Sequence, residues 1–150
     1  SDPIKSLIHA GDSAVEVFIA EPNFYRPLLK FLFSAEEPIQ RSAFMSRSFS
    51  YWNKAVEPLV KSGHLLGKPL NSIDIARDML IFFTGATEFW VHNDMNADEF
   101  RAQVRHGVSI RMLSILDGVE QKVFAGHIAD IRPTFACLAQ TENDLQNIDI

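Results

Sequence analysis

Glu88 and His92 are the two residues whose types and spacing could let them share a metal ion, because they lie one helical turn apart. The other histidines are scattered along the chain: His9, His64, His106 and His127. A catalytic zinc site uses three protein ligands and a structural site uses four, so one suitably spaced pair does not make a site. Cys137 has no base near it in the sequence, and a free cysteine usually behaves as a small buried hydrophobe. We therefore predict no metal, no cofactor and no catalytic residue.

The aromatic residues suggest a different kind of site. The chain has 12 Phe, 2 Trp and 2 Tyr among 150 residues, and most large apolar residues of a globular protein belong to its core. A subset lies at helical spacing, together with methionines that adapt to irregular shapes, and such faces can enclose a pocket. We predict that these residues bind a small apolar or aromatic molecule: Phe18, Met45, Phe49, Trp52, Met79, Phe83, Thr87 and Trp90.

A second site is predicted on the helix that begins at Asn71 or Ser72 and ends at Val91. This helix is apolar almost all round, with Gly85 in a patch of small residues at its centre. A surface helix needs only one apolar stripe, so the second stripe must be covered by something else. We predict a homodimer about a two-fold axis, formed by Ile75, Phe82, Gly85, Phe89, Val108, Arg111 and Met112. The alternative is that the last helices of the same chain cover this face.

The elements that position these residues are all expected to be helices. Apolar residues recur every three or four positions, and no alternating strand pattern of convincing length is present. The pattern predicts helices at about 3–19, 24–35, 39–62, 72–91, 97–116 and 119–131, with a short helical turn at 135–138. We expect Pro27 to lie in the opening turn of its helix and Pro58 to kink or split the third helix near Val56. The predicted fold class is all-α, a single-domain bundle of six to seven helices.

Composition narrows the classes of protein further. Apolar residues make up 47% of the chain, but the longest apolar runs are about five residues and a membrane span needs about 20. The net charge of −5, with no dense cluster of Lys or Arg, makes this chain alone a poor binder of nucleic acid. A single cysteine suits the reducing cytoplasm, where we expect the protein to lie. Because it begins at Ser1, we expect the chain to be a piece of a longer protein.

Several segments, taken in order, resemble the ligand-binding domains of TetR-family transcriptional regulators. The run Glu21-Pro22-Asn23-Phe24-Tyr25-Arg26-Pro27-Leu28-Leu29 is similar to the segment after the second bundle helix of those domains. The tryptophan-bearing stretch 52–65, which contains a glycine turn, is similar to the next helix. The helix 75–91 with its central Gly85 and the capped helix 97–116 resemble the two that follow. The resemblance covers residues 3–116, and its strength lies in the order of the elements.

The resemblance implies an effector-binding and dimerisation domain, which we place at residues 1–140, and the polar composition of residues 141–150 predicts a loosely held tail. In that family, the last two core helices form the dimer, an apolar cavity holds a small molecule, and ligand binding releases operator DNA. The DNA is bound by a helix-turn-helix domain that precedes this region and is absent from this chain. Two other functions stay open. The chain could be a stand-alone helical carrier of an apolar ligand, or a helical-bundle enzyme assisted by a metal at Glu88 and His92.

Overall fold

The bundle is built from helices whose bounds follow local signals in the sequence. The structure, a computed structural model, describes residues 2–34, 36–63, 65, 70–116 and 118–131, and these ranges contain six α-helices and no β-strand. The helices are α1 (Pro3–Ala20), α2 (Pro22–Phe33), α3 (Pro38–Lys61), α4 (Ser72–Val91), α5 (Ala97–Ile115) and α6 (Gly118–Ile131). The predicted all-α fold class is confirmed. The predicted turn at 135–138, the tail at 141–150, His64 and Cys137 lie outside the described residues.

Side chains and prolines at the N-termini explain where the helices begin. A carboxylate oxygen of Asp2 accepts a hydrogen bond from the backbone N–H of Ile4 at 3.0 Å, and α1, α2 and α3 each have proline in their first turn. Proline fits there because its missing N–H would have no partner inside the helix. Asn71 and Asn96 begin α4 and α5 with capping boxes, in which the side chain of the third helical residue bonds back to the cap.

The prediction about Pro27 is wrong, and of the prediction about Pro58 the split is contradicted. Helix α2 begins at Pro22, directly after Glu21, so Pro27 lies in the second turn rather than the opening one. The helix begins earlier because Pro22 is itself a good first residue. Helix α3 is not split at Pro58 but continues to Lys61. Only the last turn of α3 follows Pro58, so its missing N–H removes one hydrogen bond near the end of the helix.

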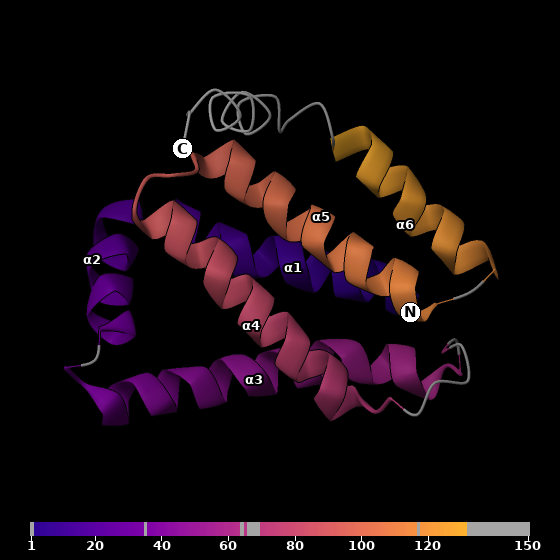
Figure 1. Ribbon diagram of the computed structural model, residues 1–150, viewed down its shortest axis with the longest axis horizontal. Helices are drawn as coiled ribbons and strands as arrows, with labels where there is room; N and C mark the ends of the chain where they lie inside the picture. The colour runs from indigo at the N-terminus through magenta and orange to yellow at the C-terminus, as the bar shows by residue number, and fades with distance from the viewer. Residues whose placement is uncertain (1, 35, 64, 66–69, 117, 132–150) are drawn as a thin grey trace, which may run out of the picture.

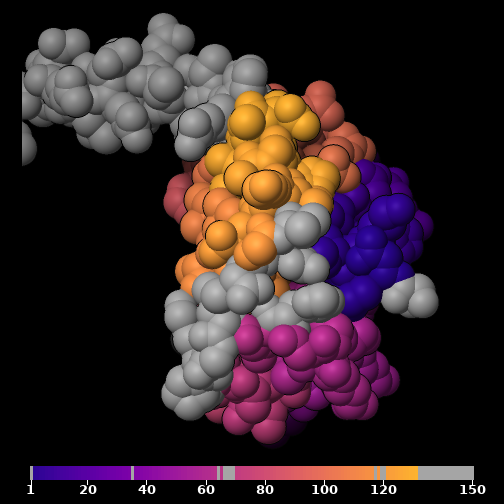
Figure 2. All heavy atoms as spheres, turned by 90° about the vertical axis from the view of Figure 1, so that its right-hand side faces the viewer, coloured from indigo at the N-terminus to yellow at the C-terminus, as the bar shows by residue number. Residues whose placement is uncertain are grey.

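Helix α1 lies behind α4 and α5 in the view of Figure 1. Helix α4 crosses over α3, α5 lies along α1, and α1 also contacts α3, while α2 closes one end of the bundle (Figure 1). Helix α6 packs on α5, and α1, in indigo, lies beside them (Figure 2). No helix in the described ranges is long and apolar enough to cross a membrane.

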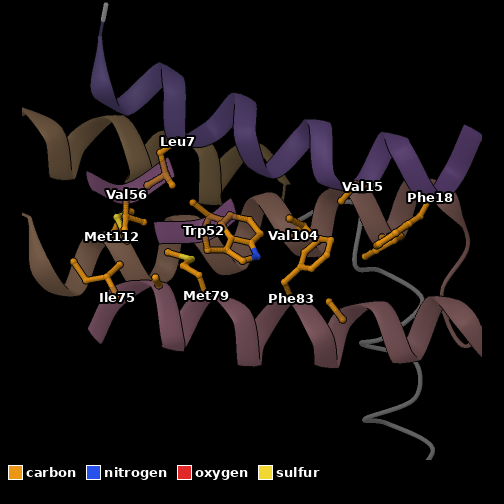
Figure 3. Packing of buried hydrophobic residues seen from close by; sticks show 14 of the residues in the cluster. Leu7, Val15, Phe18, Trp52, Val56, Ile75, Met79, Phe83, Val104 and Met112 are labelled. Carbon is orange, nitrogen blue, oxygen red and sulfur yellow. The ribbon is translucent and has the colours of Figure 1, made fainter. Parts of the chain in front are cut away.

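The core lies between α1, α3, α4 and α5. Trp52 of α3 is at its centre and is 1% exposed, with Met79 and Phe83 of α4 on one side and Leu7 and Val15 of α1 on the other (Figure 3). Met79 and Phe83 are four residues apart, and Leu7 and Val15 are eight residues apart, so each pair lies on one face of its helix. The core therefore fixes which faces of α3 and α4 remain outside it.

Candidate functional site

Aromatic rings fill the end of the core that the sequence predicted to be a pocket. Phe18 of α1 stacks on Phe83 at 6.0 Å and on Trp90 at 6.4 Å between ring centroids. Trp52 lies 5.4 Å from Phe83, and Trp90 lies 5.4 Å from Phe100 of α5. Such offset and tilted pairs are the favoured arrangements of aromatic rings. Four of the predicted pocket residues thus pack against each other. A ligand would have to bind in the space beside these rings.

That space is a hollow between α1 and α3, which we name the α1–α3 hollow. Its volume is about 230 Å³, and it is lined by Ala14, Val17, Phe18, Phe44, Arg47, Ser48, Tyr51, Trp52 and Phe83. The buried rings of Phe18, Trp52 and Phe83 form its apolar floor. Helix α3 supplies a single face, because its lining residues are spaced by three or four positions. Three of the eight predicted ligand-binding residues are brought together here.

The other five predicted residues do not line this hollow. Met79, Thr87 and Trp90 are at most 1% exposed and belong to the packed core. The Thr87 hydroxyl donates to the carbonyl of Phe83 at 2.7 Å, so its hydrogen is used within α4. Met45 and Phe49 are half-buried, and the sulfur of Met45 faces the hydroxyl of Thr84 at 3.9 Å.

A larger hollow lies on the opposite side of α4, where the sequence predicted the dimer interface. This α4–α5 hollow has a volume of about 700 Å³ and is lined by Ile81, Phe82, Gly85, Ala86, Phe89, Asp94, Met95 and Gln103. Ile81 is 68% exposed and Phe89 is 53% exposed, so the apolar stripe of α4 is left uncovered here. A Cβ atom built on Gly85 would meet nothing within 4 Å, which leaves room for another backbone. Phe82, Gly85 and Phe89 of the predicted interface therefore lie together on an open surface.

The remaining predicted interface residues face inward. Ile75, Val108 and Met112 are 6%, 2% and 0% exposed and pack in the core of the same chain. Arg111 is half-buried, and its Nε lies 2.6 Å from a carboxylate oxygen of Asp78 on α4. Residues that the sequence predicted to form the dimer interface thus help to hold α4 and α5 together within one chain.

The ring of Phe82 on α4 packs directly against Gly107 of α5. Its ring occupies the space where a Cβ of Gly107 would lie, so only glycine allows this approach. On its other side, the guanidinium of Arg111 lies 4.2 Å from the ring centroid, a cation–π distance. Phe82 therefore borders the α4–α5 hollow while being held in place by α5.

Ion pairs hold α1 to α5 on the side away from α3. The two acidic residues of α1, Asp12 and Glu16, pair with Arg105 and Arg101 respectively. Arg101 lies 2.5 Å from Glu16, and its hydrogen bond holds the pKa of the Glu16 carboxyl below its ordinary value. On the α3 side, the hydroxyl of Tyr51 donates to the carbonyl of Ala10 at 2.6 Å. Burial raises the pKa of that hydroxyl, so it stays protonated as a donor.

The predicted metal pair is found where its spacing implies. His92 Nε2 lies 3.2 Å from a carboxylate oxygen of Glu88, and both side chains are exposed at the C-terminal end of α4. Within the described ranges, no group of three histidine, cysteine or acidic residues comes close enough to hold a metal ion. The two side chains form an ion pair when His92 is protonated, and a positive charge is stabilised at the C-terminal end of a helix.

Sequence reasoning missed several residues of both hollows. The lining residues Phe44, Arg47, Ser48 and Tyr51 lie on a face of α3 rotated from the one that Met45 and Phe49 define. Counting back from Trp52 in steps of four reaches Ser48 and Phe44, so the periodicity was present in the sequence. Which of two adjacent faces lies against α1 depends on packing, which the sequence pattern alone does not specify.

The chain matches no family model, no curated protein and no solved structure. The features of the structure that bear on function are the two hollows, the apolar stripe of α4 and the order of the helices.

Proposed function

We propose that this chain is the effector-binding and dimerisation domain of a TetR-like transcriptional regulator. In this proposal, a small apolar or aromatic molecule is sensed here, and operator DNA is bound by a separate N-terminal domain. The observation that carries the proposal is the apolar stripe of α4 at the α4–α5 hollow, which the chain's own described helices leave uncovered.

The uncovered stripe supports a homodimer. Ile81 and Phe89 are large apolar residues more than half exposed, and contiguous apolar patches of this kind mark interaction sites. Between them, Gly85 presents no side chain, so a symmetry-related helix can approach its backbone. Contact about a two-fold axis would place the same stripe of both copies against each other. The hollow beneath it would then be closed by the partner.

The α1–α3 hollow supports effector binding. Its floor of Phe18, Trp52 and Phe83 is apolar and aromatic, and a few polar side chains lie at its rim. Ligand pockets commonly combine these features. Its volume of about 230 Å³ is below the roughly 300–1,000 Å³ of drug-sized pockets, which favours a small effector.

Consecutive residues of α4 connect the two sites. Phe83 lines the α1–α3 hollow, and Phe82 lines the α4–α5 hollow. A ligand that displaces the Phe83 ring would rotate or shift this turn of α4 and so change the position of Phe82. Regulation requires that the ligand bind two arrangements of the dimer with unequal affinity, and this turn is where we place the difference.

Native mass spectrometry of the purified chain tests the proposal. We expect a dimer, and a co-purified effector would appear as extra mass that is lost on denaturation. A monomer at concentrations of tens of micromolar would overturn the dimer and favour the stand-alone carrier, which needs the α1–α3 hollow alone. A basic three-helix unit encoded upstream of Ser1 would support the regulator over the stand-alone carrier.

A further inference from the structure

A cation lies at the rim of the α1–α3 hollow. Arg47 is exposed and, among the described residues that line the hollow, is the one that carries a charge. In the described part of the chain, no carboxylate pairs with Arg47. The floor of the hollow is formed by buried rings, so the site has an apolar end and a cationic end.

The charges of the neighbouring helices explain why Arg47 is left without a partner. Both acidic residues of α1, Asp12 and Glu16, are engaged by arginines of α5. Helix α3 has three basic residues and no acidic residue from Pro38 to Val56, although the whole chain has a net charge of −5. The positive charge at the rim is therefore not neutralised by either helix that forms the hollow.

Helical spacing places the cation in reach of a ligand. Arg47 and Ser48 lie one turn before Tyr51 and Trp52 on the same face of α3. The guanidinium has a planar fork of donors that matches a carboxylate, and the Ser48 hydroxyl can add another donor. A molecule whose apolar part lies on the floor of the hollow would thus have its other end at these donors.

We propose that the α1–α3 hollow selects a small organic carboxylate, with its apolar group on the aromatic floor and its carboxylate paired with Arg47. This inference rests on the proposed effector site and specifies the chemistry of its ligand. A neutral molecule of the same shape would leave Arg47 unpaired and would bind more weakly.

Isothermal titration calorimetry with two matched probes tests this inference at neutral pH. The probes are 4-butylbenzoate and 4-butylbenzamide, which share their apolar part and differ in charge. We expect the benzoate to bind about five- to tenfold more tightly, because a charged hydrogen bond at a partly exposed site is worth a modest amount. The preference should shrink as salt is raised, since the pair lies at the surface.

Variants of α3 assign the preference to a residue. Arg47→Gln should bind the two probes with nearly equal affinity, whereas Lys54→Gln should retain the wild-type preference. Lys54 is the matched control because it is an exposed cation two turns further along α3 and does not line the hollow. Ser48→Phe should fill the hollow and abolish binding of both probes.

The outcomes separate this inference from the proposed function. Equal binding of the two probes to the wild type, unaffected by Arg47→Gln, would overturn the carboxylate preference and leave the apolar effector site standing. Binding that survives Ser48→Phe would overturn the inference by placing the probes elsewhere. Absence of binding by either probe at millimolar concentration would overturn both the inference and the effector site.

Discussion

The substitution Gly85→Leu separates the folding of this chain from its association. A Cβ at position 85 meets nothing within 4 Å, so the monomer has room for a larger side chain. Glycine inside a helix is about 0.8 kcal/mol less favourable than leucine, so the isolated chain should become slightly more stable. In a dimer formed through the α4 stripe, the same side chain would fill the space between two crossing helices.

The effect on association can be estimated from the cost of overpacking. An overpacked side chain costs about 1–3 kcal/mol, and a two-fold axis places two leucines at the crossing, for a total of about 2–6 kcal/mol. The dimer dissociation constant should therefore rise by about 30-fold or more. Sedimentation velocity across a dilution series measures this change, and circular dichroism checks that helix content is retained.

Gly126→Leu provides the matched control. Gly126 is a second exposed helical glycine, on α6, with nothing within 4 Å of its Cβ position. It should gain the same helix propensity without changing the dimer dissociation constant. If Gly85→Leu associates as tightly as Gly126→Leu, the crossing at Gly85 does not exist and the dimer face has been assigned to the wrong side of α4.

Three further predictions concern the packing described above. Gly107→Ala should push the Phe82 ring off α5. The unfolding free energy should change by less than about 1 kcal/mol, because the higher helix propensity of alanine offsets the lost cation–π contact. Unchanged nuclear Overhauser contacts between Phe82 and Arg111 would contradict this prediction. Glu16 has a lowered pKa in the fold, so its contribution is present above about pH 4.5 and is lost as the pH falls below that value. Glu16→Gln should therefore reduce the loss of unfolding free energy at acid pH, measured by urea titration, by less than about 1 kcal/mol, because the ion pair is exposed. An unchanged pH dependence of the unfolding free energy would refute the role of the ion pair. Trp52→Ala should lower the unfolding free energy by about 3–5 kcal/mol, because this side chain is 1% exposed, and a loss below about 1 kcal/mol in urea titration would disagree.

The helices were predictable because their signals are local. The capping boxes at Asn71 and Asn96 and the proline after Asp2 each involve residues within one turn of each other. The start of α2 was placed too late because Glu21-Pro22-Asn23 has the composition of a loop. A single residue, Glu21, is enough to separate α1 from α2.

The sites were predictable only in part, because they depend on contacts between helices. That α4 is apolar on two sides was visible in the sequence, and the structure leaves Ile81 and Phe89 exposed on one of them. That Val108 and Met112 are covered by the same chain follows from how α5 packs, which its own periodicity does not specify. Trp52 was predicted to bind the ligand, but its burial makes it part of the core as much as of a binding surface.

The attachments of α1 differ in chemistry on its two sides, so different conditions weaken each of them. Toward α5, α1 is held by arginine–carboxylate pairs at two successive turns, Asp12 and Glu16. Toward α3, in the described part of the chain, it is held by apolar contacts and the Tyr51 hydrogen bond to Ala10. The α1–α5 contact therefore includes charges that salt screens, whereas the α1–α3 contact, along which the smaller hollow opens, depends on apolar packing.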